Sequence, residues 1–255
     1  MIAIIDYDAG NMRSVQKALL RLGAEPVSTR DRETILGADH IILPGVGAFG
    51  DAMANLKKYG LDQVIYEAVE QKIPFLGICL GLQLLFESSE ESPGAEVLGI
   101  LKGKILRIPD CEGIKIPHMG WNSLSYPQQG RLFWGIPENT YVYFVHSYYL
   151  KADNPEIVKA STHYSTEIHA SVEKENVFAC QFHPEKSSRW GLKILENFIH
   201  VERASSPGEG TILKKSGLEE KEAAKDILKE REEWDVYKED HSLSGCSRGA
   251  CGKGC

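Results

Sequence analysis

Residues 74–83 read Pro-Phe-Leu-Gly-Ile-Cys-Leu-Gly-Leu-Gln, an apolar run that leads into a cysteine bracketed by glycines. The run is typical of a buried strand, and the segment Leu80 to Glu87 is typical of a helix that follows at once. Gly77 and Gly81 remove side chains that would clash in a sharp strand-to-helix bend. The pattern therefore predicts a tight turn with Cys79 at its apex, beside a helix N-terminus.

A cysteine at such a turn has a chemical use. Exposed amide groups and the helix dipole favour the thiolate, which is the nucleophilic form. The N–H group of Leu80 is placed to donate a hydrogen bond to an oxyanion. A buried structural cysteine accounts for the same residues, so this stretch alone leaves both interpretations of Cys79 open.

The chain before this stretch alternates short apolar strands with helices. The expected strands are 2–5, 26–29 and 40–43, and the expected helices are 12–22, 31–36, 51–58 and 61–71. This alternation predicts βαβ units and a parallel sheet, in which ligands bind beyond the carboxyl ends of the strands. The glycine-rich turns 44–50 and 77–81 lie at such ends.

The chain after residue 91 has a different sequence pattern. Short β-branched or aromatic runs occur at 100–108, 123–126, 141–150, 157–162, 169–172 and 177–182. We expect these runs to add a more antiparallel second half to the same sheet, closed by a helix over 191–202. The predicted fold class is α/β, with a mixed, mostly parallel central sheet flanked by helices.

The composition changes again at residues 205–210, where a strongly charged segment begins. We expect one domain over residues 1–203, followed over 204–255 by a linker, a charged helix and a flexible cysteine-rich tail. The three cysteines of the tail could bind a soft metal, but their spacing is not that of a zinc finger. They are Cys246, Cys251 and Cys255. We predict no metal site.

The overall composition limits the possible partners. The chain has 255 residues, 42% of them hydrophobic, and a net charge of −7. The length suits one domain with a sizeable core, and the negative charge argues against a nucleic-acid or anionic-membrane surface. No apolar run is long enough to cross a bilayer, and the chain starts directly as a strand with no basic segment before it. We therefore expect a cytoplasmic protein.

A second motif, residues 181–187, contains a histidine and a glutamate two positions apart. Pro184 disfavours helix at His183, so the segment is expected to be extended, with residues i and i+2 on the same side. His183 and Glu185 can then face one site. Cysteine, imidazole and carboxylate are the parts of a nucleophilic triad; a buried histidine beside a surface glutamate is the alternative.

The turn Pro44-Gly45-Val46-Gly47 is a third motif. Its glycines let the backbone approach a ligand and turn an N–H group toward it. The Val46 or Gly47 amide could supply a second oxyanion donor. An ordinary glycine-rich turn between a strand and a helix is the alternative.

Together these motifs resemble those of the triad-type (class I) glutamine amidotransferases. The resemblance implies that family's fold. Five segments resemble, in order, the glutaminase subunits of imidazole glycerol phosphate synthases. They are 6–11, 44–49, 117–122, 143–148 and 181–187, and the resemblance extends over residues 1–203. It implies that glutamine is split, without a cofactor, into glutamate and ammonia. It also implies a separate (β/α)8-barrel synthase subunit, which uses the ammonia to form imidazole glycerol phosphate and AICAR in histidine biosynthesis.

The resemblance also implies roles for individual residues. Cys79 would attack the side-chain amide of glutamine, His183 would accept the thiol proton and pass it to the departing ammonia, and Glu185 would orient His183. The implied oxyanion donors are Leu80, Val46 and Gly47. The implied glutamine contacts are Gly45, Gly47, Gln83, Glu91, Ser147 and Tyr148. The implied contacts with the synthase are Asn11, Met119, Trp121 and Tyr143.

Several alternatives remain open at this point. Glu91 ends an acidic run that could simply be solvated, and Trp121 could be a core residue. A related amidotransferase that supplies ammonia to surface-sugar amidination would keep the same triad. A binding module with an inactive site on the same fold is the non-enzymatic alternative, and the intact Cys79, His183 and Glu185 argue against it.

Overall fold

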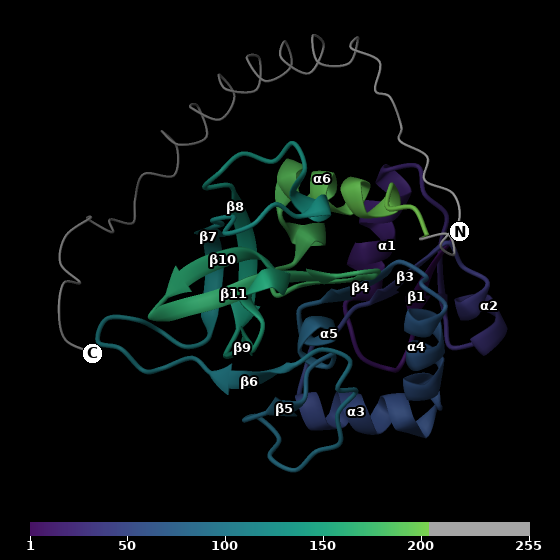
Figure 1. Cartoon of the computed structure of the whole chain (residues 1–255), viewed down its shortest axis with the longest axis horizontal. Coiled ribbons are helices and arrows are strands. Elements are labelled where there is room, and N and C mark those ends of the chain that lie inside the picture. Colours follow the sequence, from purple (N-terminus) through teal and green to yellow (C-terminus); the bar gives the residue numbers. More distant parts are fainter. Residues whose placement is uncertain (204–255) are drawn as a thin grey trace, which may run out of the picture. The chain divides into compact units, whose positions relative to one another are not determined.

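A seven-stranded sheet runs through the computed structural model of the chain, which describes residues 1–203 (Figure 1). The elements of the first half are β1 (Ile2–Ile5), α1 (Met12–Arg21), β2 (Pro26–Thr29), α2 (Arg32–Leu36), β3 (His40–Leu43), α3 (Phe49–Lys58), α4 (Leu61–Glu70), β4 (Phe75–Ile78) and α5 (Leu80–Gln83). These bounds lie close to those expected from the sequence, and the alternation of strands and helices is confirmed.

The second half is built mainly from strands. Its elements are β5 (Ser88–Ser89), β6 (Gly103–Arg107), β7 (His118–Ser123), η1 (Arg131–Phe133), β8 (Tyr141–His146), β9 (Tyr148–Ala152), η2 (Pro155–Ile157), β10 (Val158–Tyr164), β11 (Thr166–Lys174), β12 (Val177–Cys180), η3 (Pro184–Lys186) and α6 (Ser188–Ile199). The three η elements are single 3₁₀ turns.

The order of strands in the large sheet is β10-β11-β12-β4-β3-β1-β2. Strands β12, β4, β3, β1 and β2 run parallel, whereas β10 and β11 are antiparallel to their neighbours. The carboxyl ends of β3, β4 and β12 therefore meet at one edge of the sheet. These three adjacent strands lead into the turn 44–50, into Cys79 and into the segment that contains His183.

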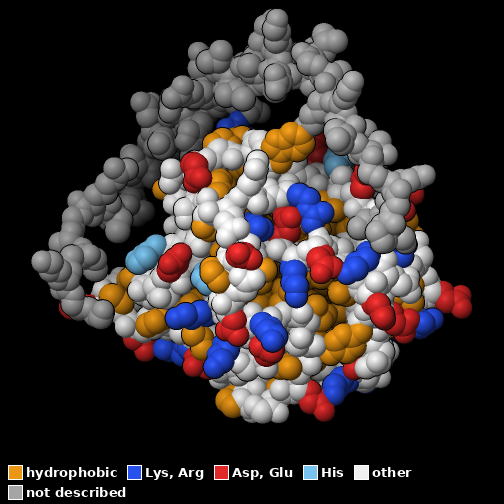
Figure 2. Space-filling model, viewed as in Figure 1, with side chains coloured by type: hydrophobic (Ala, Val, Ile, Leu, Met, Phe, Trp, Pro, Cys, Tyr) orange, Lys and Arg blue, Asp and Glu red, His pale blue; other side chains and the backbone are white. Residues whose placement is uncertain are grey.

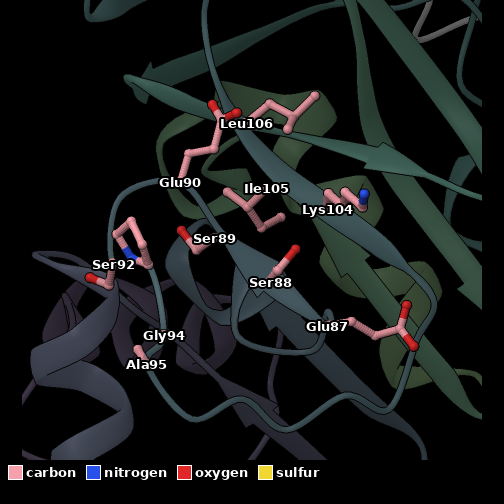
Figure 3. Close-up of a pocket in the computed structure, with 11 residues that line it drawn as sticks. Glu87, Ser88, Ser89, Glu90, Ser92, Gly94, Ala95, Lys104, Ile105 and Leu106 are labelled. Atoms are coloured by element: carbon pink, nitrogen blue, oxygen red, sulfur yellow. The ribbon is translucent and has the colours of Figure 1, made fainter.

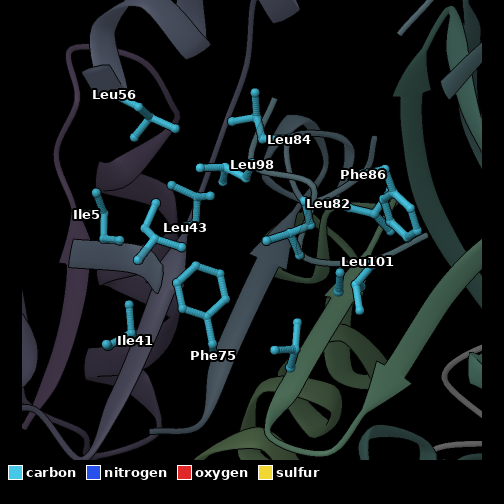
Figure 4. Close-up of a cluster of buried hydrophobic side chains, with 14 of the residues drawn as sticks. Ile5, Ile41, Leu43, Leu56, Phe75, Leu82, Leu84, Phe86, Leu98 and Leu101 are labelled. Carbon is cyan, nitrogen blue, oxygen red and sulfur yellow. The ribbon is translucent and has the colours of Figure 1, made fainter. Parts of the chain in front are cut away.

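Both faces of this sheet are covered. One apolar cluster lies on the side of α3 and α4 and includes Leu43, Leu56 and Phe75 (Figure 4). A second cluster on the opposite face joins α1 and α6 to the sheet, with Leu19 and Phe198 among its fully buried residues. Because both faces are buried, β1, β3, β4 and β12 read as continuous apolar runs rather than alternating ones.

The prediction that the second half only extends the same sheet was partly wrong. Strands β10 to β12 do extend it, but β5, β6 and β9 form a separate sheet, and β7 and β8 form a pair of their own. The run 141–150 breaks at Ser147, whose carbonyl accepts a hydrogen bond from the Ile108 N–H instead of continuing the β8 ladder. In the run 123–126, Ser123 is the last residue of β7 and Ser125 forms an isolated bridge with Ser161. Strand β7 was not expected, because its polar and glycine-containing residues show no strand pattern.

Figure 2 shows acidic and basic side chains interspersed over one face of the molecule. Within residues 1–203, no helix is long and apolar enough to cross a membrane. The predicted linker, charged helix and cysteine-rich tail at 204–255 lie outside the described residues.

Candidate active site

The strand β4 turns sharply into α5 at Cys79. The backbone of Cys79 has φ 55° and ψ −107°, which is unusual for a residue other than glycine. Its N–H group donates to the Cys180 carbonyl on β12 at 2.8 Å, so the turn is tied to the neighbouring strand. Strained backbone of this kind persists only where the surrounding structure holds it, and it is common at functional sites.

The two glycines around Cys79 are required by close backbone contacts. A Cβ atom at Gly81 would lie 1.9 Å from the carbonyl oxygen of Leu43, at the end of β3. A Cβ atom at Gly77 would lie 2.6 Å from the carbonyl oxygen of Gly81. Both distances are far below van der Waals contact, so the expectation that side chains would clash in this bend is confirmed.

The helix after Cys79 is shorter than expected. It ends at Gln83, and the next residues Leu84, Leu85 and Phe86 are fully buried in the core. A single turn sums few peptide dipoles, so its electrostatic effect on the thiol is small. Leu80 is the first residue of α5, and its N–H group is one of those that have no acceptor within the helix.

His183 and Glu185 form a buried pair near the carboxyl end of β12. His183 Nδ1 lies 2.9 Å from Glu185 Oε1, and the two side chains are 2% and 1% exposed. His183 is extended as expected, but Glu185 reaches it through the 3₁₀ turn η3 rather than by alternation along an extended chain. The His183 N–H group also donates to the Tyr143 carbonyl on β8 at 2.9 Å.

The contact with Glu185 fixes the orientation of the His183 imidazole and places a proton on its Nδ1. A carboxylate accepts, so His183 Nδ1 donates and Nε2 is left to exchange protons. Within residues 1–203, no hydrogen-bond partner reaches His183 Nε2 or Glu185 Oε2, although both atoms are buried. Burial lowers the pKa of His183, but Cys79 and Glu185 outweigh it and raise this pKa to about 10. Because Nε2 makes no hydrogen bond here, we attribute the effect of Cys79 to its proximity.

The sulfur of Cys79 lies near polar groups of β8 and of the residue that follows β12. Its side chain is buried, with Sγ 3.9 Å from the Val145 carbonyl oxygen and 3.8 Å from Gln181 Nε2. Gln181 was not singled out from the sequence, although it precedes His183 by two residues and so shares its side of an extended chain. Gln83 was expected to reach glutamine, yet its amide nitrogen donates to Gln181 Oε1 at 3.2 Å and to the Tyr148 carbonyl at 3.0 Å.

The glycine-rich turn after β3 lies directly against the sharp turn at Cys79 between β4 and α5, which we call the elbow. A Cβ atom at Gly45 would lie 2.6 Å from the Tyr7 hydroxyl and 2.7 Å from the Leu80 Cβ. That hydroxyl donates to the Pro44 carbonyl at 2.8 Å. Burial, followed by the charge of Cys79, raises the pKa of Tyr7, so the phenol stays protonated. Gly47, with φ 103°, lies in a conformation that favours glycine. Its role and that of Val46 as oxyanion donors stay predictions.

The Glu91 carboxylate accepts a backbone hydrogen bond and is not simply solvated. One of its carboxylate oxygens accepts from the Phe49 N–H at 2.9 Å, at the first turn of α3. The next residue, Ser92, accepts from the Gly50 N–H at 3.1 Å. These two contacts hold the segment after β5 to the end of the glycine-rich turn. Contact of Glu91 with a substrate amino group stays a prediction, as does contact of Ser147 and Tyr148 with glutamine.

A surface cavity of about 410 Å³ lies beside this segment (Figure 3). Its lining comes from the β5 region and from β6, and includes Glu90, Ser92 and Lys104. Neither Cys79 nor His183 lines it. The cavity is therefore separate from the reactive groups, and we assign it no part in the chemistry.

Of the four residues expected to face a partner, two are exposed and two, Asn11 and Tyr143, are half-buried. Met119 and Trp121 on β7 are 63% and 51% exposed, which excludes the alternative of a core tryptophan. Tyr143 pairs with Trp121 across β7 and β8, with ring centroids 6.1 Å apart. Asn11 lies in front of α1 and accepts from the Ser14 hydroxyl. Within residues 1–203, no group of three or more ligating side chains could hold a metal ion.

The site can now be compared with known proteins. Residues 3–201 match the family described as glutamine amidotransferase class-I. The chain is 54% identical, over 202 residues, to the imidazole glycerol phosphate synthase subunit HisH of Moorella thermoacetica; the match covers 79% of this chain and 95% of that protein. This chain belongs to the HisH family of class-I glutamine amidotransferases. The HisH subunit of Methanocaldococcus jannaschii is 52% identical, with coverage of 79% and 100%.

Two solved structures share the fold of this chain. The structure of PurLQS from Thermotoga maritima has a TM-score of 0.60 at 23% identity, covering 78% of this chain and 96% of that one. A crystal structure titled as a glutamine amidotransferase has a TM-score of 0.62 at 22% identity, covering 78% and 99%. At these identities the likeness shows the fold alone. It confirms the predicted α/β class.

The raised pKa of His183 predicts a dependence of stability on pH. The ordinary pKa of about 6.5 in the unfolded chain lies below the folded value. The charged imidazole therefore stabilises the fold fully below pH 6.5, and this contribution is lost as the pH rises through about 10. In Glu185→Gln the carboxylate is gone, so the folded pKa falls, and the contribution is smaller and is lost completely at a lower pH. Urea unfolding at pH values from 6 to 10 measures both curves.

The exposed His163, whose side chain lies on the surface, provides the control. His163→Gln is expected to leave the curve unchanged. Parallel curves for the wild type and Glu185→Gln would mean that the carboxylate does not hold the proton on His183.

Proposed function

We propose that this chain is the glutaminase subunit of an imidazole glycerol phosphate synthase, with Cys79, His183 and Glu185 as its catalytic triad. The observation that carries the proposal is the buried His183–Glu185 pair, in which the nearby Cys79 helps to raise the pKa of His183, in a chain of the HisH family. The alternative of a sugar-pathway paralogue is disfavoured by relatives at 50% identity or more that carry the HisH name.

In the first half-reaction, the Cys79 sulfur forms a bond to the side-chain amide carbon of glutamine. His183 Nε2 takes the thiol proton, and the carbonyl oxygen becomes an oxyanion that the Leu80 amide and the Val46–Gly47 turn stabilise. When the C–N bond breaks, the imidazolium gives its proton to the departing nitrogen, which leaves as ammonia. A glutamyl thioester remains on Cys79.

In the second half-reaction, water attacks the thioester carbon while His183 accepts one of its protons. The C–S bond breaks, the sulfur regains a proton, and glutamate leaves. Throughout both steps Glu185 Oε1 holds the imidazole by Nδ1, so that Nε2 always faces the reacting atoms. The elevated pKa of His183 suits a group that holds the thiol proton until the departing nitrogen takes it.

The ammonia needs a closed path to its consumer, because in water it is protonated and lost. We propose that the consumer is a (β/α)8-barrel synthase subunit, which docks on the face that carries Asn11, Met119, Trp121 and Tyr143. The name of the relatives as a subunit supports the existence of a partner. Exposed tryptophan and methionine beside polar residues are typical anchors of such interfaces.

Loss of the nucleophile should abolish the activity. We expect Cys79→Ala to lower glutamate release from glutamine by about 10⁴-fold or more, because the residual rate without a triad member comes only from binding and oxyanion contacts. The release is measured with the full chain alone and with the synthase subunit and its ribonucleotide substrate, which should stimulate it.

Cys180 gives a matched control for this variant. It is a fully buried thiol on β12, and burial followed by the nearby Glu185 and Cys79 raises its pKa, so that it stays protonated and inert. Cys180→Ala should keep the activity. Unchanged release in Cys79→Ala would refute the triad, whereas Cys79-dependent release that the synthase does not stimulate would refute the partner.

Trp121 is the side chain that tests the docking face. Removing a large exposed aromatic anchor should weaken binding of the synthase by about 10- to 100-fold, as measured by titration calorimetry. Trp134 is similarly exposed, at 57%, but is not part of the β7–β8 face, so Trp134→Ala should bind as the wild type does. Equal affinities for the wild type and Trp121→Ala would place the docking surface elsewhere.

A further inference from the structure

Two buried histidines face one another across β7 and β8, close to the triad but without a role in the mechanism above. His118 and His146 are paired in register, and His118 Nδ1 lies 3.0 Å from His146 Nε2. Their residues are 3% and 6% exposed. The His118 ring is stacked between the rings of Phe144 and Tyr164, at centroid distances of 4.8 and 3.9 Å. Hydrogen bonding and ring stacking therefore hold these two imidazoles in place in the interior.

The hydrogen bonds around the pair can run in only one direction. His146 Nδ1 lies 2.9 Å from the Tyr148 carbonyl oxygen, which can only accept, so Nδ1 carries the proton. In a neutral ring His146 Nε2 is then an acceptor, and His118 Nδ1 must donate to it. His118 Nε2 is consequently an acceptor as well, and Asn122 Nδ2 faces it at 3.4 Å.

The orientation of the Asn122 amide is fixed independently. Its oxygen accepts from the Ser123 N–H at 2.9 Å, and its nitrogen donates to the His163 carbonyl at 3.0 Å. The amide therefore presents N–H groups, and not its oxygen, to His118. The chain of donors runs from Asn122 through His118 and His146 to the Tyr148 carbonyl.

This chain requires both rings to be neutral. Burial lowers the pKa of His118 to about 4. Burial is the main cause that lowers the pKa of His146 to about 3. The hydrogen bond to the Tyr148 carbonyl opposes this shift, and the nearby His118 and His183 add to it. A second proton on His146 would put two N–H groups against each other at His118, so geometry and burial favour the same tautomers.

The hydrogen-bond chain ends at the Tyr148 carbonyl, which a side chain of α5 also contacts. The Tyr148 carbonyl accepts from Gln83 Nε2 on α5 as well as from His146. Gln83 in turn contacts Gln181, whose amide nitrogen lies 3.8 Å from the Cys79 sulfur. Tyr148 and Ser147 belong to the predicted wall of the glutamine pocket. The position of this wall relative to Cys79 is therefore set from both sides.

We propose that His118 and His146 are positioning residues for glutamine hydrolysis: their directional chain from Asn122 to the Tyr148 carbonyl holds the Ser147–Tyr148 wall at the correct distance from Cys79. This inference rests on the proposed function. It also connects the pocket to β7, the strand that carries the exposed Met119 and Trp121.

His118→Phe isolates the effect of the hydrogen bond. Phenylalanine keeps a ring between Phe144 and Tyr164 but removes the donor to His146, which leaves a buried acceptor without a partner. Because the wall contacts bound glutamine, we expect the KM for glutamine to rise about tenfold while kcat changes by less than about threefold. His118→Asn places an amide N–H at the position of Nδ1 and should restore KM to within about twofold of the wild type.

His40→Phe is the matched control. His40 is also buried, its Nε2 contacts the Val201 carbonyl at 2.9 Å, and its ring packs edge-on against Phe198. It lies at the start of β3, at the end of the strand opposite the elbow, so its loss should leave KM unchanged. The assays use the full chain with the synthase subunit, and a thermal melt checks that each variant is folded.

The tautomers provide a readout that does not depend on activity. Nitrogen-15 NMR of the wild type should show both imidazoles neutral at pH 7, each with its proton on Nδ1. A proton on Nε2 of His146, a charged ring, or a folded His118→Phe with the KM of the wild type would overturn the inference. If His118→Phe does not fold, the tautomers and His118→Asn decide. If the wild type releases no glutamate, the proposed function fails, whereas the tautomers still confirm or refute the chain.

Discussion

The close contact between the backbone of α5 and the end of β3 constrains the whole site. Gly81 lies so near the Leu43 carbonyl that no side chain fits between them. This contact holds the turn at Cys79 against β3, and Cys79 has a positive φ that costs about 1–3 kcal/mol for a residue other than glycine. The hydrogen bond from Cys79 to Cys180 and the packing of Leu80 and Leu82 in the core offset that cost.

The order of strands then brings the reacting groups together. Because β3, β4 and β12 are adjacent and parallel, the glycine-rich turn, the cysteine and the histidine leave the sheet at the same edge. Strand β8 closes the site from the side, since Tyr143 holds the His183 N–H and the Val145 carbonyl faces the sulfur. Only one turn of helix follows Cys79. The chemistry is therefore organised by the sheet rather than by the helix dipole.

Local patterns were sufficient to predict the first half of the fold and the residues Cys79, His183 and Glu185 of the proposed triad, which the structure brings to one edge of the sheet. Apolar runs such as Ile2–Ile5 and His40–Leu43 mark buried strands, and the glycines around Cys79 mark the bend, because both depend on nearby residues. The partners in space could not be predicted in the same way. Strand β7 exists only because its residues pair with β8, and the contacts of Gln181 with Cys79 and of His118 with His146 join residues that are distant in the sequence or unmarked by any pattern.

The most direct test of this account is to locate the nucleophile chemically. The full chain would be treated with a glutamine analogue that carries an electrophilic ketone in place of the side-chain amide, digested, and mapped by mass spectrometry. We predict a covalent adduct on Cys79, none on Cys111 or Cys180, and much slower labelling in His183→Ala. An adduct on another cysteine, or labelling of Cys79 that does not depend on His183, would contradict the account.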